Sequence, residues 1–153
     1  MDTATWNRLR ISMFRLHHNG YLTADLETAA ALLEKRFNYV REGATVHDPI
    51  QTAHVLLLRL PGDQPWLELV TPDGPASKLA RALRKDGEGW HHVCYEVEDI
   101  LAAGLRLRDQ GMLPLCEPVP ASAFPGRRLS WFMDAKGFLV ELVEARDRVA
   151  PSL

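Results

Sequence analysis

Apolar and polar positions along the chain predict strands and helices in an order that occurs twice. Between Leu26 and Phe37 the apolar residues recur every three or four positions, which is typical of an amphipathic helix. Asp25, just before them, is suited to cap the free N–H groups of that helix. Around this helix, strands are predicted at residues 14–23, 39–46, 53–60 and 66–71. The first half of the chain is therefore strand–helix–strand–strand–strand.

The second half repeats this order. Its helix is predicted from Asp99 to about Gln110, and a shorter helix over 76–83 precedes it. Its strands are predicted at residues 91–97, 113–117, 128–133 and 138–144. The fold class is α+β, with two tandem βαβββ modules. The boundaries are an N-terminal tail 1–13, a first module 14–72, a linker 73–89, a second module 90–145 and a C-terminal tail 146–153.

A short sequence is also present twice. His17 and His18 return as His91 and His92, and each of these matches is shifted by 74 residues. Leu67-Glu68-Leu69-Val70 returns as Val140-Glu141-Leu142-Val143, shifted by 73 residues. Each half thus carries a histidine pair near its start and a glutamate within an apolar strand near its end. Two copies of such a half-site suggest a metal site that the halves share.

The chemistry of these residues supports that interpretation. Because side chains alternate along a strand, only one histidine of each pair faces the inside of its module. Glu68 and Glu141 have apolar same-face neighbours, where an ionised carboxylate is costly unless it is paired or binds a metal. Neutral imidazole and carboxylate together suit divalent ions. The alternative is that the glutamates face solvent and the histidines are ordinary core or edge residues.

Composition narrows the classes of partner. The formal net charge of −2 argues against nucleic acid or a membrane surface as a partner. No apolar run approaches the roughly 18 residues needed to span a bilayer. The two cysteines give no disulfide framework. A cytoplasmic protein that acts on a small molecule is expected.

Four segments carry a resemblance to a known family: His18-Asn19-Gly20 with Asp25-Leu26, Glu68 shortly before Pro72, His92 after Trp90-His91, and Val140-Glu141-Leu142. Over roughly residues 14–145 the chain resembles the vicinal-oxygen-chelate superfamily, and within it the methylmalonyl-CoA epimerase-like proteins. The resemblance implies a half-open, eight-stranded barrel-like sheet around one divalent ion, Co, Ni, Zn or Mn. It implies His18, Glu68, His92 and Glu141 as the ligands of that ion.

The activity that the resemblance implies is a metal-dependent epimerase or isomerase. Such an enzyme moves a proton on the carbon next to a polarised carbonyl, here of an acyl thioester, with Glu141 and Glu68 as the catalytic residues. The alternatives are a glyoxalase I-type lactoylglutathione lyase and a non-enzymatic resistance-type protein that binds a small molecule. An extradiol dioxygenase is disfavoured because it uses three protein ligands on iron, whereas this chain offers a fourth.

Further residues are candidates for substrate binding. They are Gln51, Lys78, Arg127 and Arg128, of which the cationic side chains could hold the phosphates of a CoA or carrier-protein thioester. The chain departs from the epimerases at Ile50, where they usually carry an acidic residue. Glu144 is expected on the opposite strand face from Glu141, in solvent. Many relatives in the superfamily dimerise, so a homodimer is expected.

Overall fold

A computed structural model describes residues 13–146 and contains three helices and nine strands within them, which confirms the α+β class. The predicted tails, apart from one residue of each, lie outside the described residues. The chain forms two compact units. The first unit is residues 18–92, and the second unit is residues 13–17 together with 93–146. No helix of the described part is long and apolar enough to cross a membrane.

The first unit contains a four-stranded mixed sheet with strand order β2-β3-β4-β1. β1 is parallel to β4, and the other pairs are antiparallel. The sequence prediction of these elements is confirmed to within a few residues at each end. Their bounds are β1 Arg15–Leu22, α2 Leu26–Phe37, β2 Val40–Asp48, β3 Ala53–Arg59, β4 Trp66–Pro72 and α3 Lys78–Asp86.

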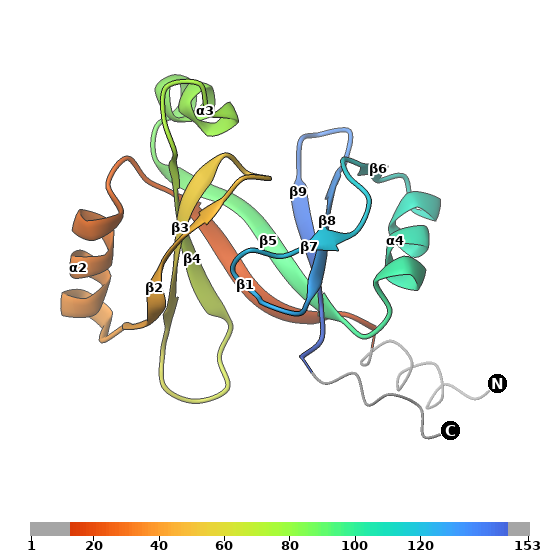
Figure 1. Cartoon of the computed structure of the whole chain (residues 1–153), viewed down its shortest axis with the longest axis horizontal. Coiled ribbons are helices and arrows are strands. Elements are labelled where there is room, and N and C mark those ends of the chain that lie inside the picture. The colour runs from red at the N-terminus through yellow and green to blue at the C-terminus, as the bar shows by residue number, and fades with distance from the viewer. Residues whose placement is uncertain (1–12, 147–153) are drawn as a thin grey trace. The chain divides into compact units, whose positions relative to one another are not determined.

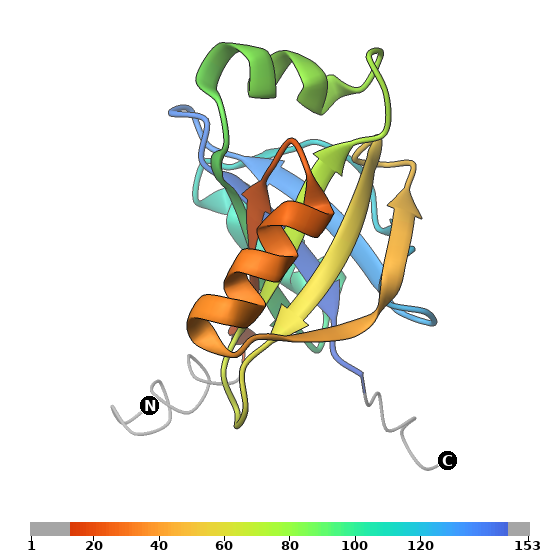
Figure 2. The same cartoon turned by 90° about the vertical axis from the view of Figure 1, so that its left-hand side faces the viewer.

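Helix α2 covers one face of this sheet, as Figure 2 shows with α2 in orange in front of β3 in yellow. Asp25 caps the helix as predicted, since its carboxylate accepts from the Thr28 N–H at 3.1 Å. Leu26 and Ala30 of the helix pack on a leucine cluster of β3 and β4 made of Leu56, Leu58, Leu67 and Leu69. Because side chains alternate, the residues between these leucines face away from α2.

The second unit has the strand order β5-β9-β8, with β6 and β7 both paired to β8. β5 is parallel to β9, and β8 is antiparallel to β9. Helix α4 packs on one face of this sheet (Figure 1). Its Ile100 and Ala103 belong to a buried cluster with Phe132, Val140 and Leu142. The bounds are β5 Gly89–Val97, α4 Ile100–Asp109, β6 Leu113–Pro114, β7 Val119–Pro120, β8 Arg128–Met133 and β9 Leu139–Glu144.

The predicted strand 113–117 is wrong in its length. β6 ends at Pro114, and the separate strand β7 follows at Val119–Pro120. Proline has no N–H to donate to a strand partner, so Pro114, Pro118 and Pro120 interrupt a continuous ladder along β8. Two short strands therefore replace one, and the described residues contain nine strands instead of the expected eight.

Candidate metal centre

Three side chains of types that can bind a metal meet in the first unit. His18, Glu68 and His92 are 0%, 1% and 7% exposed, so they lie in the interior. The Nε2 atoms of the two histidines are 3.2 Å apart. His18 Nε2 lies 3.8 Å from Glu68 Oε2, and His92 Nε2 lies 3.6 Å from Glu68 Oε1. The sequence prediction thus selected three residues that the fold brings together.

Strand register places two of these donors on one face. β1 pairs with β4 so that Gly20 lies opposite Glu68, and residues opposite each other in a sheet share a face. His18 precedes Gly20 by two positions and therefore points to that same face. Leu67 and Leu69, the neighbours of Glu68, belong to the α2 cluster on the other side. The alternation of β4 alone directs the Glu68 carboxylate away from the helix.

The third donor depends on a glycine. A Cβ atom added to Gly20 would lie 2.1 Å from Cε1 and 2.2 Å from Nδ1 of His92. The imidazole of His92 therefore occupies the space that any other side chain at position 20 would fill. Gly20 is required here by this close approach of a ring to the backbone.

A neighbouring histidine orients His92. The Nδ1 atoms of His91 and His92 are 2.8 Å apart, within hydrogen-bond distance. If His92 donates from Nδ1, its Nε2 carries the free electron pair that a metal ligand needs. His91 is then the acceptor that fixes this tautomer. This contact explains why a second histidine, His91, stands beside His92, which the sequence pattern alone does not explain.

The spacing of the three donors fits a divalent ion. Bonds of about 2.0–2.2 Å to nitrogen and oxygen place neighbouring ligand atoms roughly 2.8–3.6 Å apart in tetrahedral or octahedral geometry. The separations of 3.2, 3.6 and 3.8 Å are close to that range. Two imidazoles and a carboxylate in a buried place are also a donor set that suits such an ion. The residues present therefore fit the implied metal.

The second unit holds the predicted fourth residue. Glu141 is 1% exposed and lies in register with Cys94 on β5 and with Trp131 on β8. Its neighbours Val140 and Leu142 belong to the α4 cluster, so the Glu141 carboxylate points to the face away from α4. Glu68 and Glu141 thus have equivalent places in the sheets of their own units.

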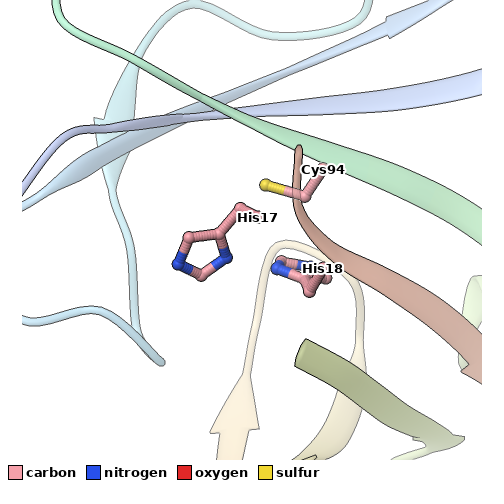
Figure 3. Close-up of side chains that lie close together, drawn as sticks. All are labelled: His17, His18 and Cys94. Atoms are coloured by element: carbon pink, nitrogen blue, oxygen red, sulfur yellow. The ribbon is translucent and has the colours of Figure 1, made fainter. Parts of the chain in front are cut away.

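The other half of the first histidine pair lies among different residues. Figure 3 shows His17 and His18 on β1 and Cys94 on β5. His17 belongs to the second unit, where its ring meets the Phe124 ring edge-on at a centroid distance of 5.0 Å. A ring nitrogen of His17 and the Sγ of Cys94 lie within 4.8 Å of one another. His18 and not His17 joins Glu68 and His92.

A buried glutamine and its aspartate partner lie next to Glu68. Gln51 is buried, and its Nε2 lies 3.4 Å from Glu68 Oε1 and 2.9 Å from Asp48 Oδ2. Asp48 is also buried, at 3% exposure. The sequence predicted Gln51 as a candidate for substrate binding but did not indicate Asp48. The turn-forming Asp48-Pro49 pair was the available signal for it.

The three predicted cationic residues do not gather in one unit. Lys78 is an exposed residue at the start of α3 in the first unit. In the second unit Arg127 Nη2 donates to Glu96 Oε2 at 2.7 Å, and its Nε donates to the Glu144 carbonyl. Arg128 Nε donates to the Glu144 carboxylate. Both arginines therefore bond groups of their own unit, and a phosphate would have to compete with these groups. Their role in substrate binding stays a prediction.

The expectation for Glu144 is wrong. This residue is 6% exposed, and its carboxylate accepts from Arg128 Nε at 2.9 Å. The same ion pair raises the pKa of the Arg128 guanidinium above its usual value. At the end of β9 the face opposite Glu141 is therefore shielded from solvent, because the ion pair with Arg128 buries Glu144.

Comparison with known proteins identifies the family. Residues 17–131 match the family model described as the Glyoxalase/Bleomycin resistance protein/Dioxygenase superfamily. The match spans more than half of the chain, and the chain belongs to this superfamily. This confirms the resemblance on which the sequence prediction rested.

Similar proteins within the superfamily are epimerases. The chain is 37% identical to the ethylmalonyl-CoA/methylmalonyl-CoA epimerase of Cereibacter sphaeroides over 84% of this chain and 96% of that protein. Its structure resembles a methylmalonyl-CoA epimerase from Mycobacterium tuberculosis with a TM-score of 0.79 and 28% identity, covering 92% and 95% of the two chains. A methylmalonyl-CoA epimerase in complex with methylmalonyl-CoA and NH4+ gives a TM-score of 0.77 and 26% identity, covering 88% of this chain and 96% of that one.

Proposed function

We propose that this protein is a divalent-metal-dependent epimerase that inverts the α-carbon of an acyl-CoA thioester. The observation that carries the proposal is the buried set of His18, Glu68 and His92, whose spacing fits a metal ion. The similarity to acyl-CoA epimerases supports the reaction and the substrate class.

Four residues would hold the ion. His18, Glu68 and His92 supply three donors from the first unit, and we assign Glu141 of the second unit as the fourth. Its assignment rests on the sequence repeat, on its burial and on its equivalence to Glu68 in strand register. A bound ion supplies positive charge beside the thioester carbonyl, which makes the neighbouring C–H more acidic.

The protein must then move the proton. A carboxylate that accepts the α-proton and returns a proton to the other face completes an epimerisation. Glu141 and Glu68 are the candidates for this role, and Glu141 is our first choice because Gln51 already contacts the Glu68 carboxylate. His91 serves the reaction indirectly by fixing the tautomer of His92.

The two alternatives have less support. The similar proteins named above are epimerases, which gives a lactoylglutathione lyase no backing. A resistance-type binding protein has no need of a buried pair of imidazoles beside a carboxylate. A homodimer and a cytoplasmic location, both expected from the sequence, remain further proposals that light scattering and cell fractionation would test.

The decisive experiment measures metal and proton exchange together. Elemental analysis of the purified parent protein is expected to find about one divalent ion per chain. The ion is expected to be lost in His92→Ala and Glu141→Ala and kept in His54→Ala, a control on another histidine of the first unit. The loaded parent is expected to exchange the α-proton of methylmalonyl-CoA for deuterium in heavy water.

The outcomes separate the alternatives. A parent protein that takes up no nickel, cobalt, zinc or manganese contradicts the proposal and leaves a binding protein as the better interpretation. A loaded parent that exchanges no proton of any acyl-CoA, but converts the hemithioacetal of methylglyoxal and glutathione, favours the lyase.

A further inference from the structure

The carboxamide of Gln51 lies between two carboxylates. Its Nε2 is 2.9 Å from Asp48 Oδ2 and 3.4 Å from Glu68 Oε1, and the residue is 8% exposed. An ionised carboxylate only accepts hydrogen bonds, whereas an amide nitrogen has two hydrogens to donate. The nitrogen must therefore face both acids. The Oε1 atom is buried and has no hydrogen-bond partner in the described part of the protein.

Asp48 is held by hydrogen bonds to both of its carboxylate oxygens. Its Oδ1 accepts from the backbone N–H of Ile50 at 2.9 Å and of Gln51 at 3.3 Å. This arrangement is an Asx-turn, in which the side chain takes the place of a backbone carbonyl. One carboxylate oxygen thus closes the turn, and the other holds the Gln51 amide.

The same turn contains strained backbone. Thr52 has φ of 54°, in the left-handed region that β-branched residues rarely adopt. The start of α3 holds it there: the Ser77 hydroxyl donates to the Thr52 carbonyl at 2.6 Å, and the Lys78 N–H donates to Thr52 Oγ1 at 3.0 Å. The Asp73 N–H also donates to the Thr52 carbonyl, at 3.0 Å. Strain of this kind persists where the surroundings impose it and is concentrated at functional sites.

We propose that Gln51 is a positioning residue of the metal centre. Its amide holds the Glu68 carboxylate in the orientation that faces His18 and His92, and Asp48 fixes the amide. This inference rests on the proposed metal-dependent function and replaces the substrate-binding role expected for Gln51. The strained turn next to it, held by α3, keeps the amide in place. Groups that orient a metal ligand typically affect metal affinity about 10–100-fold when removed.

The test uses the metal-free full chain titrated with Co²⁺. Calorimetry is expected to show about 10–100-fold weaker binding in Gln51→Leu than in the parent. The visible absorption spectrum of the cobalt protein is expected to change as well, which a loss of stability alone would not produce. Gln64→Leu is the matched control, because Gln64 is an exposed glutamine of the same unit whose amide donates to the Pro61 carbonyl. It is expected to bind Co²⁺ like the parent.

A second variant and a structure keep the inference testable. In Asp48→Asn the new amide can donate to Gln51 Oε1, so the glutamine is free to turn, and weaker Co²⁺ binding is again expected. Affinity within twofold of the parent in Gln51→Leu, or in Asp48→Asn if the first variant does not fold, overturns the inference. If the parent binds no ion, the proposed function fails. In that case crystal structures of the parent and of Gln51→Leu test the positioning role separately. A Glu68 carboxylate that has not moved in the variant overturns the positioning role.

Discussion

The two units place a buried glutamate in the same way but surround it differently. In the first unit Gly20 lies opposite Glu68 across a parallel pair, and in the second unit Cys94 lies opposite Glu141 across the equivalent pair. Each glutamate points away from the helix of its unit. Yet in the first unit the imidazoles of His18 and His92 lie beside the glutamate, whereas in the second unit Cys94 and Trp131 lie in register with Glu141.

The difference shows what a repeat does and does not conserve. The register of strand and acid is the same in both copies, since it follows from alternation and parallel pairing. The residue opposite the acid is not the same, because in the first unit a ring must approach the backbone. A glycine satisfies that demand, whereas a buried cysteine occupies the equivalent place in the second unit. Four tests, taken from the largest expected effect to the smallest, would break or sharpen this comparison.

Gly20→Ala is expected to abolish metal binding. The new Cβ would lie 2.1 Å from the His92 ring, so the imidazole must leave its place. The equivalent change in the second unit, Cys94→Ala, removes only a buried sulfur and is expected to leave about one ion per chain. Elemental analysis of both variants measures the difference. Full metal content in Gly20→Ala would mean that the position of His92 is not needed for binding.

Glu141→Gln and Glu68→Gln would show whether the two acids share the proton transfer. If Glu141 is the base, its change is expected to lower kcat for deuterium exchange by about 100-fold or more. Glu68→Gln is expected to act mainly through weaker metal binding, which excess metal would partly restore. Rates are compared at saturating metal. A Glu141→Gln protein with bound metal and full turnover would remove Glu141 from the role of base.

Arg127→Met is expected to destabilise the second unit. Arg127 and Glu96 are 9% and 21% exposed at their side chains, so the loss of one partner leaves a largely buried charge and costs about 2–3 kcal/mol. In the first unit Arg59 and Glu42 are each 43% exposed, and Arg59→Met is expected to cost about 0–1 kcal/mol. Urea denaturation measures both values. A raised KM with unchanged stability in Arg127→Met would instead favour phosphate binding.

Asp25→Ala is expected to have the smallest effect, and one that depends on pH. The Thr28 N–H and hydroxyl lower the pKa of the Asp25 carboxyl below its usual 3.8. The ionised cap therefore stabilises the fold above that value, and the contribution is lost as the pH falls through the lowered pKa. Denaturation of parent and variant at pH 7 and pH 3 is expected to show a difference that shrinks on acidification. A difference independent of pH would contradict this account of the cap.

Much of the fold could be predicted from the sequence because the repeated pattern follows local rules. Periodicity gave both helices of the modules, and alternation put Glu68 on the buried face opposite α2. The prediction of a strand at 113–117 was wrong because a proline interrupts a strand only where a neighbouring strand would accept from its missing N–H. The prediction that Glu144 lies in solvent was wrong because the alternation of faces does not reveal its ion pair with Arg128.

The site was predicted less completely than the fold. His18, Glu68 and His92 carry the chemistry that a metal requires, so residue type and repetition were enough to select them. The place of Asp48 depends on the Gln51 amide, and the strain at Thr52 depends on the Ser77 hydroxyl and on backbone angles, which no local pattern displays. The role of Gln51 follows from the positions of Asp48 and Glu68 in space, which the sequence does not give.

The order of the donors along the chain has a consequence for synthesis. His18, Glu68 and His92 all lie in one continuous segment, whereas the second unit is assembled from residues on both sides of it. A ribosome has therefore made all three donors before it reaches Val93, while the strands that carry Glu141 and its neighbours are still to come. The nascent chain therefore carries three of the four proposed metal ligands before the second unit is complete.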